Sequence, residues 1–323
     1  MAAATPGVTA PDTSGAVTPA RSRRRNPLWA NVKALGEALL WIGPALALIV
    51  GVVLYPVVEL VRAAMSRYSI TGLRLGDAGW RNVTAVLHHK DFVTVLTNTV
   101  IWVVAVVALT VAISLGVAQF LAKQFRGRTF VRWALIVPWA ASVVITAKTF
   151  VLIYNYYYGT ANLVLSRLHL TSSPVDFLGS DQLVLPSMIV VGVFVSIPFT
   201  AYVFVAGLGA IPRELYEAAQ IDGARPWQVY RLITLPLLRP ALLVASTLNI
   251  INVFNSFPII WTLNDRNPGF THDTTITFMY KLAFKSAEKD VGMSAATGVL
   301  NVLLILVVVL VYLRVVRWRE ATA

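Results

Sequence analysis

Polar side chains recur at regular spacing within two of the most apolar stretches of the sequence. They are Ser246, Asn249, Asn252 and Asn255 in residues 240–264, and Ser294, Thr297 and Asn301 in residues 291–313. Steps of three or four residues place each set on one broad face of a helix. Amides and hydroxyls in apolar surroundings need hydrogen-bond partners, which are either neighbouring helices or the contents of a hydrated path. Bonds between helices do not require three amides in register, so the asparagine set favours the path.

One cation lies inside a third apolar stretch. Lys148 is the only charged residue between Trp133 and Ser166. It lies about 24 Å along a helix from Arg132, so its stem can carry the ammonium to a membrane surface. Snorkelling or an ion pair is the simpler interpretation, and contact with a solute is the alternative. Tyr154 and the tyrosines at 156–158 lie further along, where an aromatic belt is the simpler interpretation and stacking on a bound ring is the alternative.

Other kinds of chemistry have little support in the sequence. Cysteine is absent, which excludes disulfides, thiolate metal sites and a cysteine nucleophile. The four histidines have no metal-ligand spacing, so no metal site is predicted and they are assigned surface roles: His88, His89, His169 and His272. Every Asp and Glu lies outside the apolar stretches, whereas an ion-coupled secondary carrier is expected to place carboxylates inside them. Such a carrier, or a membrane scaffold, is a disfavoured alternative.

Membrane-spanning helices must position these residues. The chain of 323 residues is 57% hydrophobic and 13% charged, too apolar for a soluble protein of its size. Six stretches can each cross a hydrocarbon core of about 30 Å as a helix: Ala38–Val58, Val93–Ala122, Trp133–Ser166, Gln182–Pro212, Pro240–Asn264 and Val291–Leu313. The sequence therefore predicts an all-α polytopic membrane protein. Its transmembrane domain is expected at residues 31–318, between a disordered basic tail (1–30) and a C-terminal tail (319–323).

Basic residues indicate the orientation of these helices. Arginines and lysines cluster at residues 21–33, 123–132 and 314–319, and by the positive-inside rule these segments are cytoplasmic, as is the charged segment 212–239. Both termini are then expected in the cytoplasm. The connections 66–92 and 265–290 are expected outside, with short β or helical pieces in the first and a surface helix in the second. The net charge of +12 indicates topology and attraction to anionic lipid rather than nucleic-acid binding.

The charged segment between the fourth and fifth stretches predicts two short helices joined by a sharp turn. Pro212 suits the first turn of a helix, and Gly223 can adopt the left-handed conformation that ends it. Pro226 is expected to begin a second helix and Pro236 to end it. Trp227, with Tyr230 and Ile233, would form an apolar stripe that the segment cannot bury by itself. The segment is therefore either cytoplasmic packing or a docking surface for another protein.

The same segment resembles a known family. Glu217-Ala218-Ala219, Gly223 and Ile233-x-Leu235-Pro236 reproduce, at the family's spacing, the EAA signature of permease subunits of binding-protein-dependent ABC importers. Other features resemble the carbohydrate-uptake branch, and within it the first permease of the maltose and glycerol-3-phosphate type: Pro44, Tyr55-Pro56, Asn98, and Gly269, Tyr280 and Ala283-Phe284 in the last outer connection. The resemblance covers about residues 37–318.

This resemblance implies a non-enzymatic, multi-pass subunit of a bacterial cell membrane that works by alternating access. Residues 212–236 would be the coupling segment: Glu217 would pair with a basic group of an ATPase, Ala218 and Ala219 would allow close approach, and Gly223 would set the angle between the helices. The sequence has no G-x-x-x-x-G-K-[ST] loop, so the chain itself would need no cofactor, and ATP and Mg²⁺ would bind to the partner.

The implied assembly contains a second homologous permease, two ATP-binding cassette subunits and an extracytoplasmic solute-binding protein, in contact with membrane lipid. A sugar or sugar derivative would pass along the polar residues of the apolar stretches. The candidates for that path are Asn249, Asn252, Asn255, Asn301, Lys148 and Tyr154.

Overall fold

The computed structural model describes residues 39–265, 267–285 and 289–321, with the side chains of residues 316–321 left aside. The predicted N-terminal tail, 1–30, lies outside the described residues. The described elements in chain order are η1 (Ile49–Leu54), α2 (Tyr55–Ala64), β1 (Ser66–Tyr68), β2 (Arg74–Asp77), α3 (Arg81–Leu87), α4 (Phe92–Ala122), α5 (Arg128–Ala140), α6 (Val143–Ile153), α7 (Thr160–Arg167), α8 (Val184–Gly209), α9 (Arg213–Ile221), α10 (Pro226–Val229), η2 (Tyr230–Thr234), α11 (Leu235–Leu237), α12 (Arg239–Phe254), α13 (Phe257–Asn264), α14 (Thr275–Phe284) and α15 (Val291–Ala321).

The chain divides into two compact units at Val57. In the first unit the chain is helical from Leu39 onward and includes the π-helical turn η1. This turn immediately precedes Tyr55-Pro56, and Tyr55 donates its N–H to the carbonyl of Val50, five residues earlier. Pro56 has no N–H to continue the α-helical ladder, and a wider turn re-pairs the neighbouring groups.

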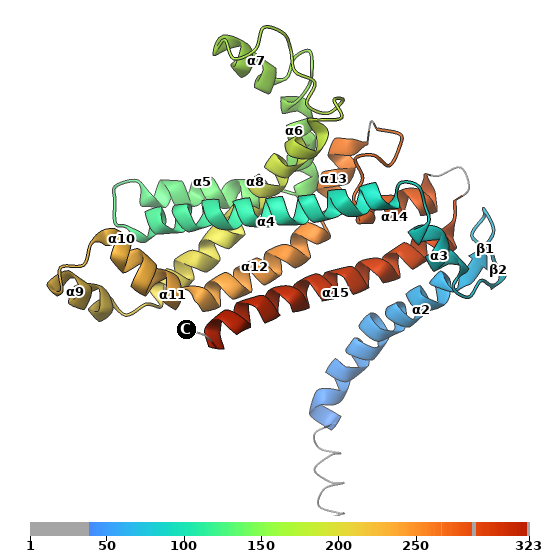
Figure 1. Cartoon of the computed structure of the whole chain (residues 1–323), viewed down its shortest axis with the longest axis horizontal. Helices are drawn as coiled ribbons and strands as arrows, with labels where there is room; N and C mark the ends of the chain where they lie inside the picture. The colour runs from blue at the N-terminus through green and yellow to red at the C-terminus, as the bar shows by residue number, and fades with distance from the viewer. Residues whose placement is uncertain (1–38, 266, 286–288, 322–323) are drawn as a thin grey trace, which may run out of the picture. The chain divides into compact units, whose positions relative to one another are not determined.

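In the second unit, long helices run side by side (Figure 1). Helix α4 packs along α8 and α12. Their shared core contains Trp102, Val106, Met188, Val191 and Val253. The indole Nε1 of Trp102 donates to the buried carbonyl of Val253 at 2.8 Å, which fixes α4 against α12. The residues of α8 are apolar on all of its faces, as expected for a helix within a membrane protein.

The two ends of this unit differ. Helices α9 and α10 lie at one end, and the hairpin β1–β2 with α3 lies at the other (Figure 1). The strands pair antiparallel, with Ser66 opposite Asp77. This hairpin and α3 confirm the predicted short strands and helix in residues 66–92. The C-terminal end of α15 points toward the end that carries α9.

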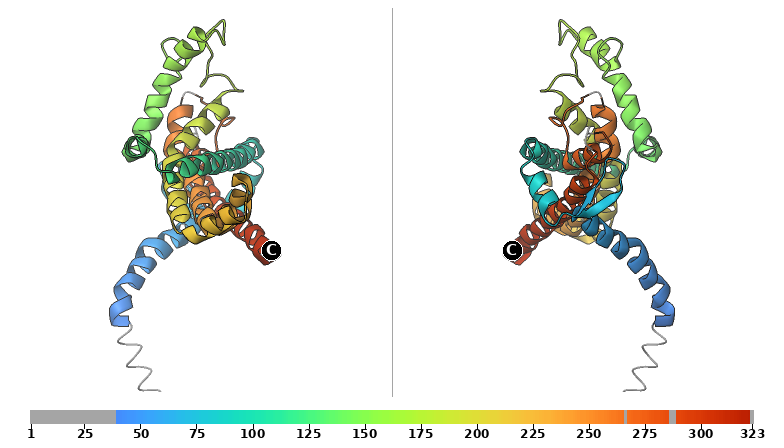
Figure 2. Two further views of the ribbon diagram at one scale, coloured as in Figure 1. Left: turned by 90° about the vertical axis from the view of Figure 1, so that its left-hand side faces the viewer. Right: turned by 90° about the vertical axis from the view of Figure 1, so that its right-hand side faces the viewer.

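Four of the described helices are long and apolar enough to cross a membrane, and two bent helix pairs raise the number to six if each pair is one span. The long helices Leu39–Ala64, α4, α8 and α15 match the predicted first, second, fourth and sixth stretches closely. The sequence predicted one helix in the third stretch, and this prediction was wrong. Helices α5 and α6 meet there at a bend of 99° (Figures 1 and 2). Pro138 removes a hydrogen bond from the last turn of α5, and Ala141 then adopts an extended conformation.

The predicted fifth stretch is also interrupted. Helix α12 ends at Phe254, and α13 begins two residues after Asn255. Pro258 cannot donate to the carbonyl of Phe254, and its ring would collide with that carbonyl in a continuous helix. The prediction of a single helix over Pro240–Asn264 was therefore wrong at this point.

Candidate functional site

The segment 213–237 forms the predicted pair of helices with a glycine turn. Gly223 has φ +71°, which only glycine adopts without steric cost. The N–H of Ala224 donates to the carbonyl of Ala219 at 2.9 Å, and the N–H of Gly223 donates to the carbonyl of Gln220 at 3.1 Å. These two bonds form a Schellman motif, which satisfies the last carbonyls of α9. The turn is therefore specified by local hydrogen bonds together with Gly223.

The second helix begins as predicted and ends differently. Pro226 occupies its first turn, and the N–H of Arg225 is satisfied by Oε1 of Gln228 at 2.8 Å. The helix then widens into η2, continues through Pro236, ends at Leu237 and meets α12 at a bend of 63°. The helix therefore ends one residue after the predicted position at Pro236, because the π turn accommodates a proline that lacks an N–H.

The two short helices present a mixed surface. Glu217 and Ala218 are exposed, whereas Ala219 is buried at 6% exposure beneath α9. Ala219 therefore packs within the chain rather than facing a partner. Five large apolar side chains are exposed on this segment: Leu215, Ile221, Trp227, Leu232 and Leu237. Tyr230 and Ile233 of the predicted stripe are only partly exposed.

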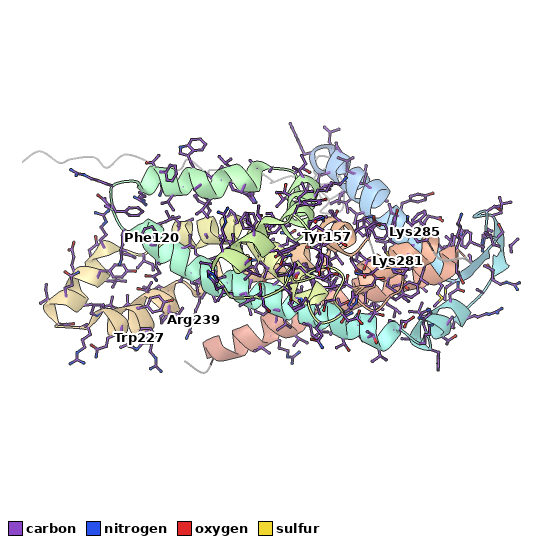
Figure 3. The ribbon with its side chains drawn as sticks, turned by 90° about the horizontal axis from the view of Figure 1, so that it is seen from above. Phe120, Tyr157, Trp227, Arg239, Lys281 and Lys285 are labelled. Carbon is purple, nitrogen blue, oxygen red and sulfur yellow. The ribbon has the colours of Figure 1, made fainter. Side chains whose placement is uncertain are left out.

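One hydrogen bond that sequence reasoning missed joins the two helices. The hydroxyl groups of Tyr216 on α9 and Thr234 on η2 lie 3.2 Å apart. Thr234 is buried, so the bond lies beneath the pair. Figure 3 shows Trp227 and Arg239 at this end of the unit and Lys281 and Lys285 toward the other. This hydrogen bond holds the two helices together as one body, at one end of the second unit.

The asparagine set on α12 does not act as one row. Asn249 is 3% exposed and donates from Nδ2 to Oγ1 of Thr200 on α8 at 2.6 Å. Asn252 is exposed, and its side chain has no hydrogen-bond partner in the part of the chain that the structure describes. Asn255 follows the last residue of α12 and donates to the carbonyl of Ile251 at 2.9 Å. A three-residue step falls short of a full helical turn, so successive members rotate from the α8 interface to an open face.

The polar residues of α15 contact α14 or their own helix. Ser294 donates to the carbonyl of Met279 at 2.8 Å, and Asn301 donates to the carbonyl of Thr275 at 3.4 Å. Thr297 donates to the carbonyl of Met293 at 3.0 Å, within α15. All three side chains are buried. In this structure they join α15 to α14 or satisfy α15 itself.

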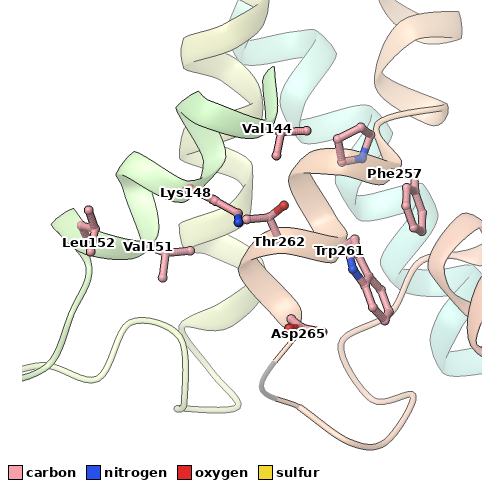
Figure 4. Close-up of a pocket in the computed structure, with 9 residues that line it drawn as sticks. Val144, Lys148, Val151, Leu152, Phe257, Trp261, Thr262 and Asp265 are labelled. Carbon is pink, nitrogen blue, oxygen red and sulfur yellow. The ribbon is translucent and has the colours of Figure 1, made fainter. Parts of the chain in front are cut away.

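Lys148 lines a cavity of about 650 Å³ between α6 and α13. The other lining residues are Val144, Val151, Leu152, Phe257, Pro258, Trp261, Thr262 and Asp265. Lys148 from α6 and Thr262 from α13 point toward one another, and Asp265 lies at the end of α13 (Figure 4). Sequence reasoning identified Lys148 but missed Trp261, Thr262 and Asp265, because only the fold places α13 opposite α6.

Tyr154 is buried rather than exposed. Its ring stacks on Phe177 with centroids 5.0 Å apart and packs against Phe150 at 5.7 Å. Tyr157 and Tyr158 are strongly exposed beyond the end of α6. Tyr156 is exposed as well, so the tyrosine cluster is divided between one packing residue and three surface residues.

A buried ion pair lies between α13 and α14, and sequence reasoning missed it. Nζ of Lys281 lies 2.9 Å from Oδ2 of Asp273, and both side chains are almost fully buried. The Lys281 ammonium also donates to the carbonyls of Asn267 and Gly269, while Oδ1 of Asp273 accepts from Asn264. Burial raises the pKa of Asp273, although Lys281 opposes this effect. The predicted helix in 265–290 is present as α14, and the pair buries two charges of this connection that the sequence alone did not show to be buried.

The sequence analysis assigned His272 to the surface, but its side chain is buried. Its Nε2 lies 2.9 Å from Oδ1 of Asp181, in the loop before α8, and its side chain is mostly buried. His89 contacts the rings of Phe270 and Phe278 edge-on. Among the described residues, no group of three or more His, Asp or Glu could hold a metal ion. These histidines contribute to packing between loops.

The fold defines a class: a polytopic helical membrane protein with a short, exposed helix pair between two apolar helices. Residues 108–320 match the family described as "Binding-protein-dependent transport system inner membrane component". The chain belongs to this family and is the membrane-embedded permease subunit of a binding-protein-dependent ABC importer. The predicted family is therefore confirmed. Such a subunit is not an enzyme and holds no cofactor, since ATP is bound by a separate subunit.

Curated relatives agree with this assignment. The chain is 37% identical to a probable ABC transporter permease protein of Brucella suis, over 84% of this chain and 93% of the relative. It is 37% identical to the trehalose/maltose transport system permease protein MalF of Thermococcus litoralis, over 75% of this chain and 80% of the relative. A bacterial ABC transporter involved in the import of alginate has the same fold, with TM-score 0.75 and 23% identity over 90% of this chain and 98% of the other.

Proposed function

We propose that this permease forms the translocation path of an importer for a saccharide, delivered by an extracytoplasmic binding protein. The observation that carries the mechanism is the rigid helix–glycine turn–helix segment 213–237, which leaves Glu217 and Trp227 exposed between two apolar helices. Relatives named for trehalose/maltose and for diacetylchitobiose support the substrate class. Ligand screening of the binding protein encoded with the permease tests that class directly.

The complete transporter would contain a second, homologous permease and two ATPase subunits. Segment 213–237 would enter a groove of one ATPase, with Glu217 next to a basic group and Trp227 in an apolar contact. Closure of the ATPase dimer would move the segment as a rigid body, because the Tyr216–Thr234 contact joins its two helices. The bend at Leu238 would pass this movement to α12 and convert an inward-open path to an outward-open one.

The proposed orientation places segment 213–237 and the C-terminus in the cytoplasm, together with the N-terminus. Two observations support it. The C-terminal end of α15 points toward the α9 end of the unit (Figure 1), and basic residues gather in the predicted cytoplasmic segments. The hairpin β1–β2 and α14 would then lie toward the outer side.

Glu217→Lys tests the docking contact without altering the turn. The variant reverses an exposed charge on α9, so attraction to a basic group of the ATPase becomes repulsion. We expect the amount of ATPase that copurifies with the complex to fall about tenfold, and uptake to fall with it. Glu214→Lys makes the same charge change one turn earlier on α9 and is the matched control. Equal losses in both variants would show that net charge, rather than Glu217, matters.

Asn252→Leu tests the path. Asn252 has an exposed amide on α12 with no partner among the described residues, so it is free to bond to a passing solute. We expect saccharide uptake to fall by about threefold to tenfold while ATPase copurification stays unchanged. Val244→Leu changes another exposed residue of the same helix and should transport normally. Normal uptake by Asn252→Leu would place the path elsewhere.

A further inference from the structure

We propose that the cavity between α6 and α13 is a subsite for an uncharged sugar ring, with Lys148 and Asp265 as its charged contacts and Trp261 with Phe257 as its apolar wall. The inference rests on the proposed function and deepens it by naming the class of saccharide. The cavity volume of about 650 Å³ lies within the range of sites for drug-sized ligands. A disaccharide is a ligand of this size.

The polar groups of the cavity are available to a ligand. Lys148, Thr262 and Asp265 all line it, and none of their side chains has a hydrogen-bond or ion-pair partner within the described ranges. Lys148 and Thr262 extend into the space from opposite helices (Figure 4). An ammonium donates only, a carboxylate accepts only, and a threonine hydroxyl does both. Sugar hydroxyls can donate to Asp265 and accept from Lys148, which satisfies both groups at once.

The charges of the cavity select for a neutral ring. Among the described residues that line the cavity, the charged ones are Lys148 and Asp265, and their charges are opposite. An anionic saccharide would be attracted to Lys148 but repelled by Asp265, and a cationic one would meet the reverse. A hydroxyl of a neutral sugar forms charge-assisted hydrogen bonds with both groups and meets no like charge.

The apolar wall is held in place before any ligand arrives. The rings of Trp261 and Phe257 are stacked, with centroids 5.8 Å apart and planes at 11°. Tyr280 packs edge-on against Trp261 at 4.8 Å and also contacts Phe257 at 4.9 Å. These contacts restrict the rotamers of the wall, so a ligand loses little affinity to ordering side chains. The C–H faces of a sugar ring can lie against this surface, and its edge hydroxyls can reach the charged groups.

The absence of cysteine from the sequence provides a direct test. Leu152→Cys places a single thiol in the lining of the cavity, and Tyr157→Cys places one on an exposed residue outside it. The full transporter, with cysteine-free partner subunits, is reconstituted from a detergent without a sugar headgroup. The rate at which a hydrophilic maleimide labels this chain is then measured with added disaccharide. We expect maltose or N,N′-diacetylchitobiose to slow labelling of Leu152→Cys at least threefold and to leave Tyr157→Cys unchanged.

Charged analogues and charge-removing substitutions test the selectivity. Maltobionate is the anionic counterpart of maltose, and deacetylated chitobiose is the cationic counterpart of N,N′-diacetylchitobiose. We expect neither to protect Leu152→Cys. Adding Asp265→Asn leaves Lys148 as the only charge, so maltobionate should now protect at least threefold. Adding Lys148→Met leaves Asp265, so chitobiose should protect instead.

Four outcomes overturn the inference, and only the last also overturns the proposed function. If no neutral disaccharide slows labelling while the complex still imports a saccharide, the cavity is not a sugar subsite and the proposed function stands. If charged and neutral sugars protect equally, the selectivity argument is wrong. If only a lipophilic maleimide reaches Leu152→Cys, the cavity opens to lipid and no sugar enters it. A complex that imports no saccharide at all removes the proposed function, and the inference with it.

Discussion

Gly223→Val is expected to abolish saccharide uptake while leaving the permease in the membrane and bound to its partner permease. The Cβ of valine would meet no atom within 4 Å, so the effect is not a collision. It comes from the backbone, because φ +71° costs an L-residue about 1–2 kcal/mol and a β-branched residue more. The chain relieves that cost by leaving the left-handed conformation, which breaks the two hydrogen bonds of the Schellman motif and changes the angle between α9 and α10.

Two measurements separate this effect from misfolding. Uptake into vesicles and copurification of the ATPase should both fall to background, whereas copurification of the partner permease should match the wild type. Gly223→Asn is the matched control, since asparagine tolerates the left-handed conformation better than other residues that carry a side chain, and it should retain most of the uptake. If Gly223→Val transports normally, segment 213–237 does not couple to the ATPase through a fixed turn.

Lys281→Met is expected to destabilise the permease by about 3–5 kcal/mol, the typical cost of leaving one partner of a buried ion pair uncompensated. Asp273 would keep its hydrogen bond from Asn264 but lose the ammonium 2.9 Å away. The carbonyls of Asn267 and Gly269 would lose a donor as well. Thermal unfolding of the purified complex should show an apparent midpoint lower by on the order of 10 °C.

Two control variants test whether the loss of stability comes from an uncompensated buried charge. Lys285→Met removes an exposed cation whose ammonium, within the described part of the chain, contacts the face of Trp261 at 5.6 Å, and it should cost no more than about 1 kcal/mol. Adding Asp273→Asn to Lys281→Met removes the uncompensated carboxylate and should recover at least half of the lost stability. A double variant that is less stable than Lys281→Met would contradict this account of the pair.

The deficit of Lys281→Met should also depend on pH. Burial already raises the pKa of Asp273 above its usual value of 3.8, and removal of Lys281 raises that pKa further, because only the hydrogen bonds from Asn264 and Thr277 then favour the charged form. A group whose pKa is higher in the folded state binds more protons when folded. Stability is therefore greatest near and below the unfolded pKa and decreases as the pH rises through the folded one. The difference from the wild type should be smaller at about pH 4.5 than at about pH 7.

The sequence by itself determined the features of this protein that depend on neighbouring residues. The glycine turn, the helix start at Pro226 and the four long apolar helices were all predicted correctly. Each depends on the conformational range of one residue, on hydrogen bonds that span a few positions, or on the solubility of a continuous stretch. The EAA spacing was sufficient for the family because the motif lies within one short segment of the chain.

Tertiary structure decided which of the polar residues are free. Asn249 and Asn252 have the same side chain, yet Asn249 donates to Thr200 on α8 and Asn252 is exposed. Lys148 acquires Trp261 and Asp265 as neighbours only because α5 and α6 bend apart and α13 separates from α12. Lys281 was assigned to an outer connection, yet it is buried against Asp273. Burial and pairing depend on what packs against a residue from distant parts of the chain, and local sequence patterns do not contain that information.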